Sequence, residues 1–130
     1  MAHQYYQTIY VADTDMAGVV YHANYIRFLE AARVDMLSNY GYPYHQLHQE
    51  NIALAPIDLS IQYKAPLRLG DTCRVETSLQ SYTTATVSYQ QFIHLDKKLI
   101  TSAKIKLACI NTTTFKPMRI PTQLHSCLTN

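Results

Sequence analysis

The sequence predicts an α+β domain in which one antiparallel β-sheet curls over a single long helix. One stretch has the 3.6-residue period of an amphipathic helix, four later stretches alternate between apolar and polar residues, and short turns join those four. Consecutive strands with short connections favour antiparallel pairing, and each strand has one apolar face that a helix can cover. The 130 residues suit one domain, spanning residues 1–130.

The first strand and the long helix are expected in the first third of the chain. Alternation predicts a strand over Tyr5–Val11, with its odd-numbered residues on one face. We expect Asn24 to cap the start of the helix and Gly41 to follow its end. Because Ile26 and Val34 are apolar but lie off the main stripe, the helix is expected to be buried on more than one side. The main stripe consists of Tyr25, Phe28, Leu29, Ala32 and Met36.

The remaining chain contains the predicted strands. "PYHQLHQEN" predicts a short second helix, and clean alternation then begins at Ile57 and runs to Ala65. Gly70 and Asp71 predict a turn before "CRVETSL", whose alternation predicts the next strand. Two further strands are expected over residues 85–94 and 103–110, and "NTTTFKPMRIP" is expected to close the chain as turns with a proline stop.

Composition excludes several classes of function. The residues are 48% hydrophobic and 15% charged, and the formal net charge is +2 without a basic stripe, so nucleic-acid binding is not expected. No apolar run approaches the ~18 residues that a membrane span needs, and the N-terminus lacks the charged and apolar regions of a signal peptide. The three widely spaced cysteines, Cys73, Cys109 and Cys127, are typical of free thiols in a reducing cytoplasm.

The stretch "VADTDMAGVVYHANY" gathers two aspartates, a glycine and a histidine before the predicted helix. The helix N-terminus presents unpaired N–H groups, which can polarise a carbonyl and hold an oxyanion. A carboxylate across the glycine-containing turn could attack that carbonyl carbon or activate a water. This arrangement would suit hydrolysis of an activated acyl group without a metal. The alternative is structural: the aspartates cap or fix turns, and Gly18 supplies a positive φ angle.

Other catalytic chemistries have weaker support. The sequence contains no GxSxG nucleophile elbow, no HExxH motif and no glycine-rich phosphate loop. His45 and His48 precede Glu50, but no third cluster accompanies them, so a metal site is not expected. The cysteines have no neighbouring base in the sequence, so a cysteine nucleophile is not expected. No cofactor is expected.

The motif "DTDMAGVVYHANYIRFLEAAR" resembles that of hotdog-fold acyl-CoA thioesterases. The similar group is the 4-hydroxybenzoyl-CoA thioesterase family, including the branch associated with the bacterial Tol-Pal system. "YKAPLRLGD" and "FKPMRIP" are similar to later segments of the family and occur in the expected order. The resemblance implies a hotdog fold, in which an antiparallel sheet wraps around one long helix. It also implies a homo-oligomer, at least a dimer and often a homotetramer built as a dimer of dimers.

The resemblance also implies roles for residues of this motif. Asp15, the second acid of "DTD", matches the catalytic carboxylate, as nucleophile or general base. His22 matches the residue whose backbone N–H polarises the thioester carbonyl, and its ring is a second candidate for assistance. Asp13 matches an acid with a supporting role. The candidate substrate-binding residues at the turn and helix start are Asp13, Gly18, Val19, Tyr21, Asn24 and Tyr25.

The implied function is hydrolysis of a short-chain or aromatic acyl-CoA in the cytoplasm. Alternatives are an acyl-carrier-protein thioester or 1,4-dihydroxy-2-naphthoyl-CoA as substrate, a non-catalytic acyl-binding module, and a hotdog dehydratase. One departure concerns the coenzyme A phosphates, because "SYTTATV" at Ser81–Val87 replaces the basic cluster expected near the middle strands. Basic residues that could serve instead are Lys64, Arg68, Arg74, Lys97, Lys98 and Lys104.

Overall fold

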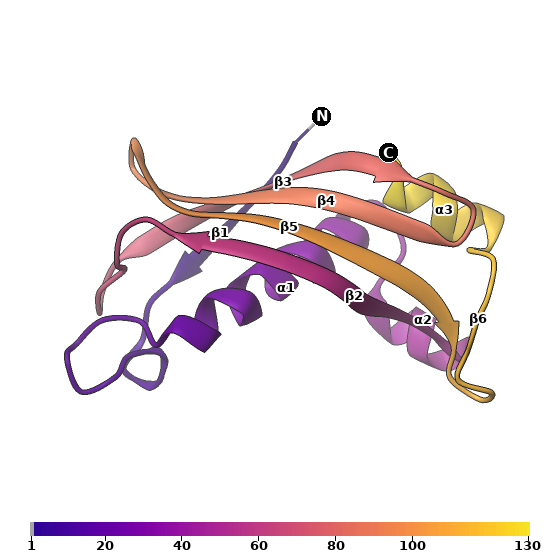
Figure 1. Cartoon of the computed structure of the whole chain (residues 1–130), viewed down its shortest axis with the longest axis horizontal. Helices are drawn as coiled ribbons and strands as arrows, with labels where there is room; N and C mark the ends of the chain where they lie inside the picture. Colours follow the sequence, from indigo (N-terminus) through magenta and orange to yellow (C-terminus); the bar gives the residue numbers. More distant parts are fainter. Residues whose placement is uncertain (1) are drawn as a thin grey trace.

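A curved antiparallel sheet arches over the long helix α1 (His22–Asn39) in the computed structural model, which describes residues 2–130 (Figure 1). The strand order is β1-β3-β4-β5-β2, and β6 pairs with β5 beyond that path. The helix packs against β1 and β3, and the two edges of the sheet are β1 and β2. The strands are β1 (His3–Thr8), β2 (Ile52–Tyr63), β3 (Thr72–Tyr82), β4 (Thr86–Leu95), β5 (Lys98–Asn111) and β6 (Lys116–Pro117).

Helix α1 forms where the apolar period predicted it. All five residues of the predicted stripe are buried, and Gly41 follows the helix with a φ of +95°, which glycine adopts without a Cβ clash. The prediction that Asn24 caps the helix was wrong, because the helix starts at His22 with Tyr21 at the N-cap position. The expectation of burial on further sides was also wrong for Ile26, which is exposed in the single chain.

The first strand ends earlier than predicted. β1 stops at Thr8, and residues 11–13 form a 3-10 turn, η1 (Val11–Asp13), in which Val11 is exposed. The chain bends there because the Asp13 carboxylate accepts the backbone N–H of Tyr10 at 2.9 Å. A local side-chain hydrogen bond therefore overrides the alternating pattern of the sequence.

The second helix was predicted, but β2 is longer than predicted. Helix α2 (Tyr44–Gln49) is followed by β2, which begins at Ile52 rather than Ile57. The strand was missed at its start because Pro56 and a register shift between Pro56 and Asp58 interrupt the alternation. The predicted face of β2 is only partly covered: Leu59 and Ile61 are half-buried.

The later strands follow their predicted faces. Cys73, Val75 and Thr77 of β3 point into the core, and the Gly70 turn has a φ of +89°. β5 starts five residues before the predicted position. At the C-terminus the expectation of turns alone was wrong, because helix α3 (Thr122–Leu128) packs there with Leu124 and Leu128 buried.

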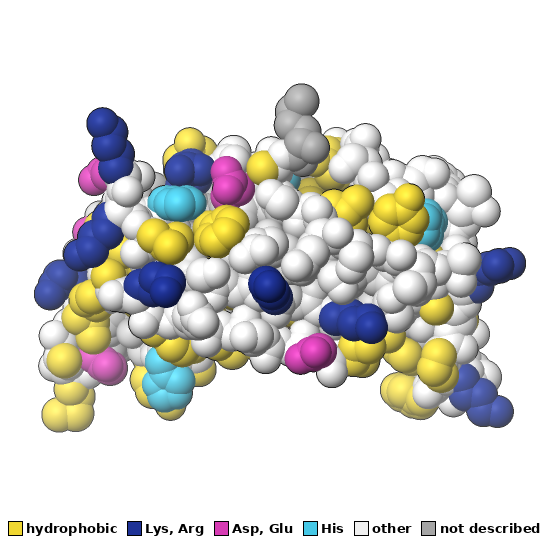
Figure 2. Space-filling view, turned by 45° about the horizontal axis from the view of Figure 1, so that its top comes forward, with side chains coloured by type: hydrophobic (Ala, Val, Ile, Leu, Met, Phe, Trp, Pro, Cys, Tyr) yellow, Lys and Arg dark blue, Asp and Glu magenta, His cyan; other side chains and the backbone are white. Residues whose placement is uncertain are grey.

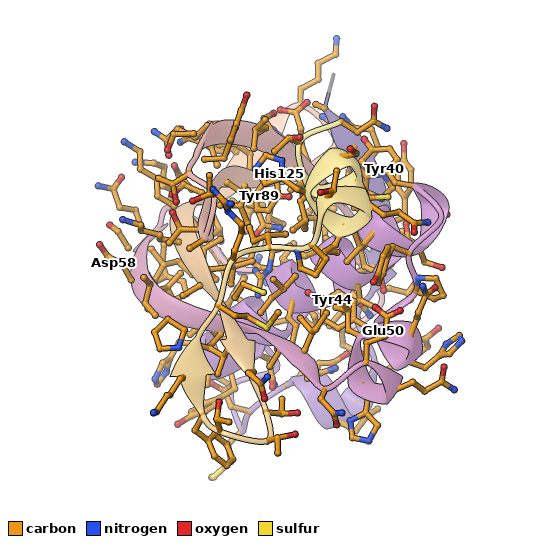
Figure 3. All side chains as sticks on the ribbon, turned by 90° about the vertical axis from the view of Figure 1, so that its right-hand side faces the viewer. Tyr40, Tyr44, Glu50, Asp58, Tyr89 and His125 are labelled. Carbon is orange, nitrogen blue, oxygen red and sulfur yellow. The ribbon has the colours of Figure 1, made fainter. Side chains whose placement is uncertain are left out.

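Helix α3 closes the end of the sheet that lies opposite the "DTD" loop (Figure 1). The hydroxyl of Tyr89 on β4 donates to the carbonyl of Leu128 at 2.6 Å, and the His125 ring bonds to the carbonyl of Thr83 at 3.1 Å. Asp58 projects from the β2 side, away from the helices (Figure 3). Among the described residues, no helix has the length and apolar character needed to span a membrane.

Candidate active site

The residues between η1 and α1 form a small hairpin, which we call the site loop (residues 13–21). The N–H of Asp15 donates to the carbonyl of Val19 at 2.9 Å, and the N–H of Tyr21 donates to the carbonyl of Asp13 at 3.1 Å. Gly18 lies at the tip with a φ of +77°, a conformation that a residue with a Cβ adopts only with strain. The glycine of the motif thus serves to turn the chain back toward the start of α1.

The site loop is also fixed to the connection between β2 and β3. Val19 pairs with Arg68 in an isolated antiparallel bridge, and the N–H of Val20 donates to the carbonyl of Leu67 at 2.9 Å. The Tyr25 hydroxyl accepts the N–H of Leu67 at 3.0 Å from the other side. Segments far apart in the sequence therefore hold the loop in one place.

Asp15 is exposed at the site loop. Its Oδ1 accepts the N–H of Ala17 at 2.9 Å, which orients the carboxylate across the turn. An exposed, locally oriented carboxylate remains accessible to a substrate or to a water molecule. Of the two acids in "DTD", Asp15 is therefore the one that is available for chemistry.

The start of α1 has no side-chain cap, so its first N–H groups are available to a ligand. Tyr21 and His22 are exposed, and their rings lie 4.4 Å apart between centroids. The Tyr63 hydroxyl on β2 donates to the carbonyl of His22 at 2.9 Å. This bond fixes the first turn of the helix to the edge strand, and Tyr63 also packs edge-on against Tyr25.

Three of the predicted substrate-binding residues are turned toward the protein. Asp13 is only 4% exposed, and Arg27 pairs with its carboxylate. The Asn24 side chain donates to the carbonyl of Asp13 at 2.9 Å, and the Tyr25 ring is buried. Their contacts organise the loop, whereas Gly18, Tyr21 and the exposed Asp15 line its open surface.

Sequence reasoning missed Tyr63 and Arg27 as members of this region. Tyr63 was assigned to the apolar face of a strand, and only the pairing of β2 with β5 brings that face to the helix start. Arg27 lies fourteen residues after Asp13, a separation that carries no local signal of an ion pair. Arg68 was a candidate for phosphate binding, and the structure places its backbone beside Val19.

Two surface hollows lie away from the site loop. One, of about 220 Å³, lies on the outer face of the sheet beside Ser60, Ser88 and Lys104. Another, of about 240 Å³, lies beside Arg119 and His125 at α3. Figure 2 shows that the outer face is largely uncharged, with a few lysines and arginines spread across it. The open surface at Asp15 is thus separate from both hollows.

Two of the side chains considered for other chemistries, Cys73 and Glu50, have surroundings that favour a structural role. The thiol of Cys73 is buried, and burial raises its pKa to about 11, which disfavours the nucleophilic thiolate. The carboxylate of Glu50 accepts the hydroxyl of Tyr42, whose pKa burial raises to about 12. His45 and His48 are exposed on α2.

The family model described as the thioesterase-like superfamily matches residues 10–128. YbgC of Escherichia coli O6:H1, an acyl-CoA thioester hydrolase, is 32% identical over 87% of this chain and 85% of its own length. YbgC of Haemophilus influenzae, an acyl-CoA thioesterase, is 32% identical over 91% of this chain and 88% of its own length. The crystal structure of a DHNA-CoA thioesterase from Staphylococcus aureus has a TM-score of 0.91 at 28% identity, covering 97% of this chain and 87% of that one.

The match of the family model covers the site loop, α1 and every strand after β1. The antiparallel sheet around one helix agrees with the solved thioesterase structures and confirms the predicted hotdog fold. The chain therefore belongs to the thioesterase-like superfamily and is a hotdog-fold thioesterase.

Proposed function

We propose that this protein hydrolyses short-chain or aromatic acyl-CoA thioesters and that Asp15 is its catalytic carboxylate. The observation that carries this proposal is the placement of an exposed, oriented carboxylate on a hairpin that leads directly into an uncapped helix start. Those two elements supply the acid and the oxyanion donors that thioester hydrolysis requires. The kinship with acyl-CoA thioesterases supports the substrate class.

The helix start would receive the thioester carbonyl oxygen. The first N–H groups of α1, at His22 and Ala23, polarise the carbonyl and then stabilise the oxyanion of the tetrahedral intermediate. Collapse of that intermediate reforms the C=O bond and breaks the C–S bond, and the coenzyme A thiolate leaves. No group other than the protein and water is needed for this sequence of bond changes.

Asp15 acts in one of two ways on the acyl carbon. As a general base it removes a proton from water, the resulting hydroxide forms the new C–O bond, and Asp15 then returns the proton to the departing thiolate. As a nucleophile it forms a mixed anhydride, which water then hydrolyses. Both routes need the ionised carboxylate, so both predict the same consequence when the carboxylate is replaced by an amide.

A second copy of the chain would complete the site. β2 is an edge strand of 12 residues whose outer side has no partner strand within residues 2–130, and its own Ile57 and Tyr63 are 55% and 45% exposed. Antiparallel pairing of two β2 edges would cover this apolar surface and the exposed side of α1 at Ile26. The acyl group would then lie between two chains, beside Tyr63. Pairing of two dimers through the largely uncharged outer face would give the homotetramer.

Two alternative substrates remain within the same chemistry. The similarity to a DHNA-CoA thioesterase favours an aromatic acyl group, including 1,4-dihydroxy-2-naphthoyl. An acyl carrier protein would present the same thioester with an acidic surface, for which the scattered lysines are suited. The free thiols of Cys73, Cys109 and Cys127 support a reducing, cytoplasmic location.

Replacing Asp15 by asparagine tests the proposal. Asp15→Asn nearly preserves size and removes both the base and the nucleophile, so kcat should fall at least ~10²-fold while folding is retained. The assay is steady-state thiol release from a panel of acyl-CoA substrates, with a thermal melt of each variant. Asp96→Asn, at an exposed acid in the β4–β5 turn, is the matched control and should retain kcat. A folded Asp15→Asn protein with near-normal kcat would refute the assignment.

A further inference from the structure

Asp13 of the site loop is bonded to α1 through two groups, its backbone carbonyl and its side-chain carboxylate. Its carbonyl accepts the N–H of Tyr21 at 3.1 Å and the side chain of Asn24 at 2.9 Å. Its carboxylate accepts the N–H of Tyr10 at 2.9 Å through one oxygen and the guanidinium of Arg27 through the other. These four donors come from the chain before the hairpin, from the end of the hairpin and from two turns of the helix.

Of the four donors to Asp13, Arg27 is the one that lies on α1 beyond the first turn of the helix. Its side chain is 55% exposed, whereas the Asp13 side chain is 6% exposed. The guanidinium carbon also lies 5.1 Å from the centroid of the Phe28 ring, which is buried in the core. Packing on a fixed aromatic ring and pairing with a buried carboxylate leave the guanidinium few alternative positions.

The position of Arg27 on the helix separates it from the reacting group. It lies five residues after His22, which turns its side chain about 140° around the helix axis from that of His22. Asp15 follows Asp13 by two residues, and the carbonyl of Asp13 is bonded to the residue that precedes the helix. A shift of Asp13 relative to α1 would therefore move Asp15 relative to the N–H groups that bind the carbonyl oxygen.

We infer that the Arg27–Asp13 ion pair positions Asp15 against the start of α1, so that Arg27 sets kcat without touching the substrate. This inference rests on the proposed function. The Arg27 side chain is 55% exposed and the Asp13 carboxylate keeps the N–H of Tyr10, so water can take the place of the guanidinium and loss of Arg27 should leave the fold nearly intact. Catalysis is more sensitive, because a misplacement of about 1 Å can cost on the order of 10²-fold in rate.

The decisive comparison is between Arg27→Ala and Arg119→Ala. Arg119 is also an exposed arginine, but it lies beside α3, away from the site loop. We expect Arg27→Ala to lower kcat about tenfold, with KM and the melting temperature nearly unchanged. Arg27→Lys should restore most of kcat, and Arg119→Ala should leave kcat unchanged. Hydrogen exchange at the amides of residues 14–20 should quicken in Arg27→Ala alone.

A double mutant tests whether the two residues act as a unit. Arg27→Ala should cause no further loss of kcat in an Asp13→Asn background, because the partner charge is already absent. Unchanged kcat in Arg27→Ala, or an equal loss in Arg119→Ala, would overturn the inference even if Asp13→Asn does not fold. Asp15→Asn in the same assay separates the failures: near-normal kcat there would refute the proposed function, whereas its loss with a fully active Arg27→Ala would refute only the positioning role.

Discussion

His22 contributes two chemically different groups at the start of α1, its ring and its backbone N–H. The ring is exposed and lies against Tyr21, while the carbonyl of the same residue accepts the Tyr63 hydroxyl at 2.9 Å. The backbone N–H belongs to the first helical turn, which has no side-chain cap. The helix therefore offers its donor whatever the side chain at this position is.

Substitution of His22 by alanine separates these two groups. His22→Ala keeps the backbone N–H, so the variant should retain part of its activity, with a loss of kcat within about tenfold and well short of that at Asp15. Steady-state thiol release measured for His22→Ala beside Asp15→Asn provides the comparison. A loss as complete as at Asp15 would make the imidazole an essential acid or base.

At the scale of elements, a buried polar layer joins α1 to the centre of the sheet. Arg33 on α1 is 4% exposed and donates to the Gln91 side chain at 2.9 Å. Gln91 in turn donates to the carbonyl of Leu29 and to the hydroxyl of Thr77. Burial lowers the pKa of Arg33, and its Nε has no hydrogen-bond partner within residues 2–130. This layer lies between two apolar clusters of the core, one at each end of the helix.

The buried layer should show strong coupling between its two members. Gln91→Leu leaves the Arg33 guanidinium without its acceptor and should destabilise the fold by about 3–5 kcal/mol. The double variant Arg33→Met/Gln91→Leu removes both polar groups and should recover much of that loss. Urea unfolding measures both, with Gln90→Leu on the neighbouring position as the control. Equal losses from the single and double variants would contradict the coupling.

The elements differ in how well the sequence predicts them. The α1 stripe and the faces of β3 were predictable because each buries a continuous apolar surface with an unbroken period. Helix α3 was missed because its seven residues carry only two buried leucines, and a short helix depends on tertiary packing. The N-cap prediction for Asn24 was wrong because its amide instead bonds to Asp13, eleven residues earlier in the chain.

At the scale of the whole molecule, the two edges of the sheet differ. β1 is a short edge of six residues beside α1, whereas β2 is a long edge of 12 residues that exposes apolar side chains of its own, Ile57 and Tyr63. Proteins usually cover a long edge strand that exposes apolar side chains, either with another part of the chain or with a second chain. Completion of the site by a second copy would cover it.

Placing a charge in this surface tests the assembly. Ile57→Lys should shift the protein toward monomers and lower kcat in parallel, because a lysine would be buried between the two copies. Tyr6→Lys, at an exposed aromatic residue on the opposite edge strand, should leave both properties unchanged. Sedimentation at micromolar concentration should give at least twice the mass of one chain for the parent protein. A fully active monomer would show that one chain holds a complete site.

The sequence by itself determined the fold class, the long helix and the motif that contains Asp15 and Gly18. These features depend on local periodicity, on glycine conformation and on residues close together along the chain. Only the tertiary structure decided which acid is buried and which is exposed, because that depends on Arg27 and on the chain around Tyr10. It also brought Tyr63 to the helix start, since strand register is set by partners far away in the sequence.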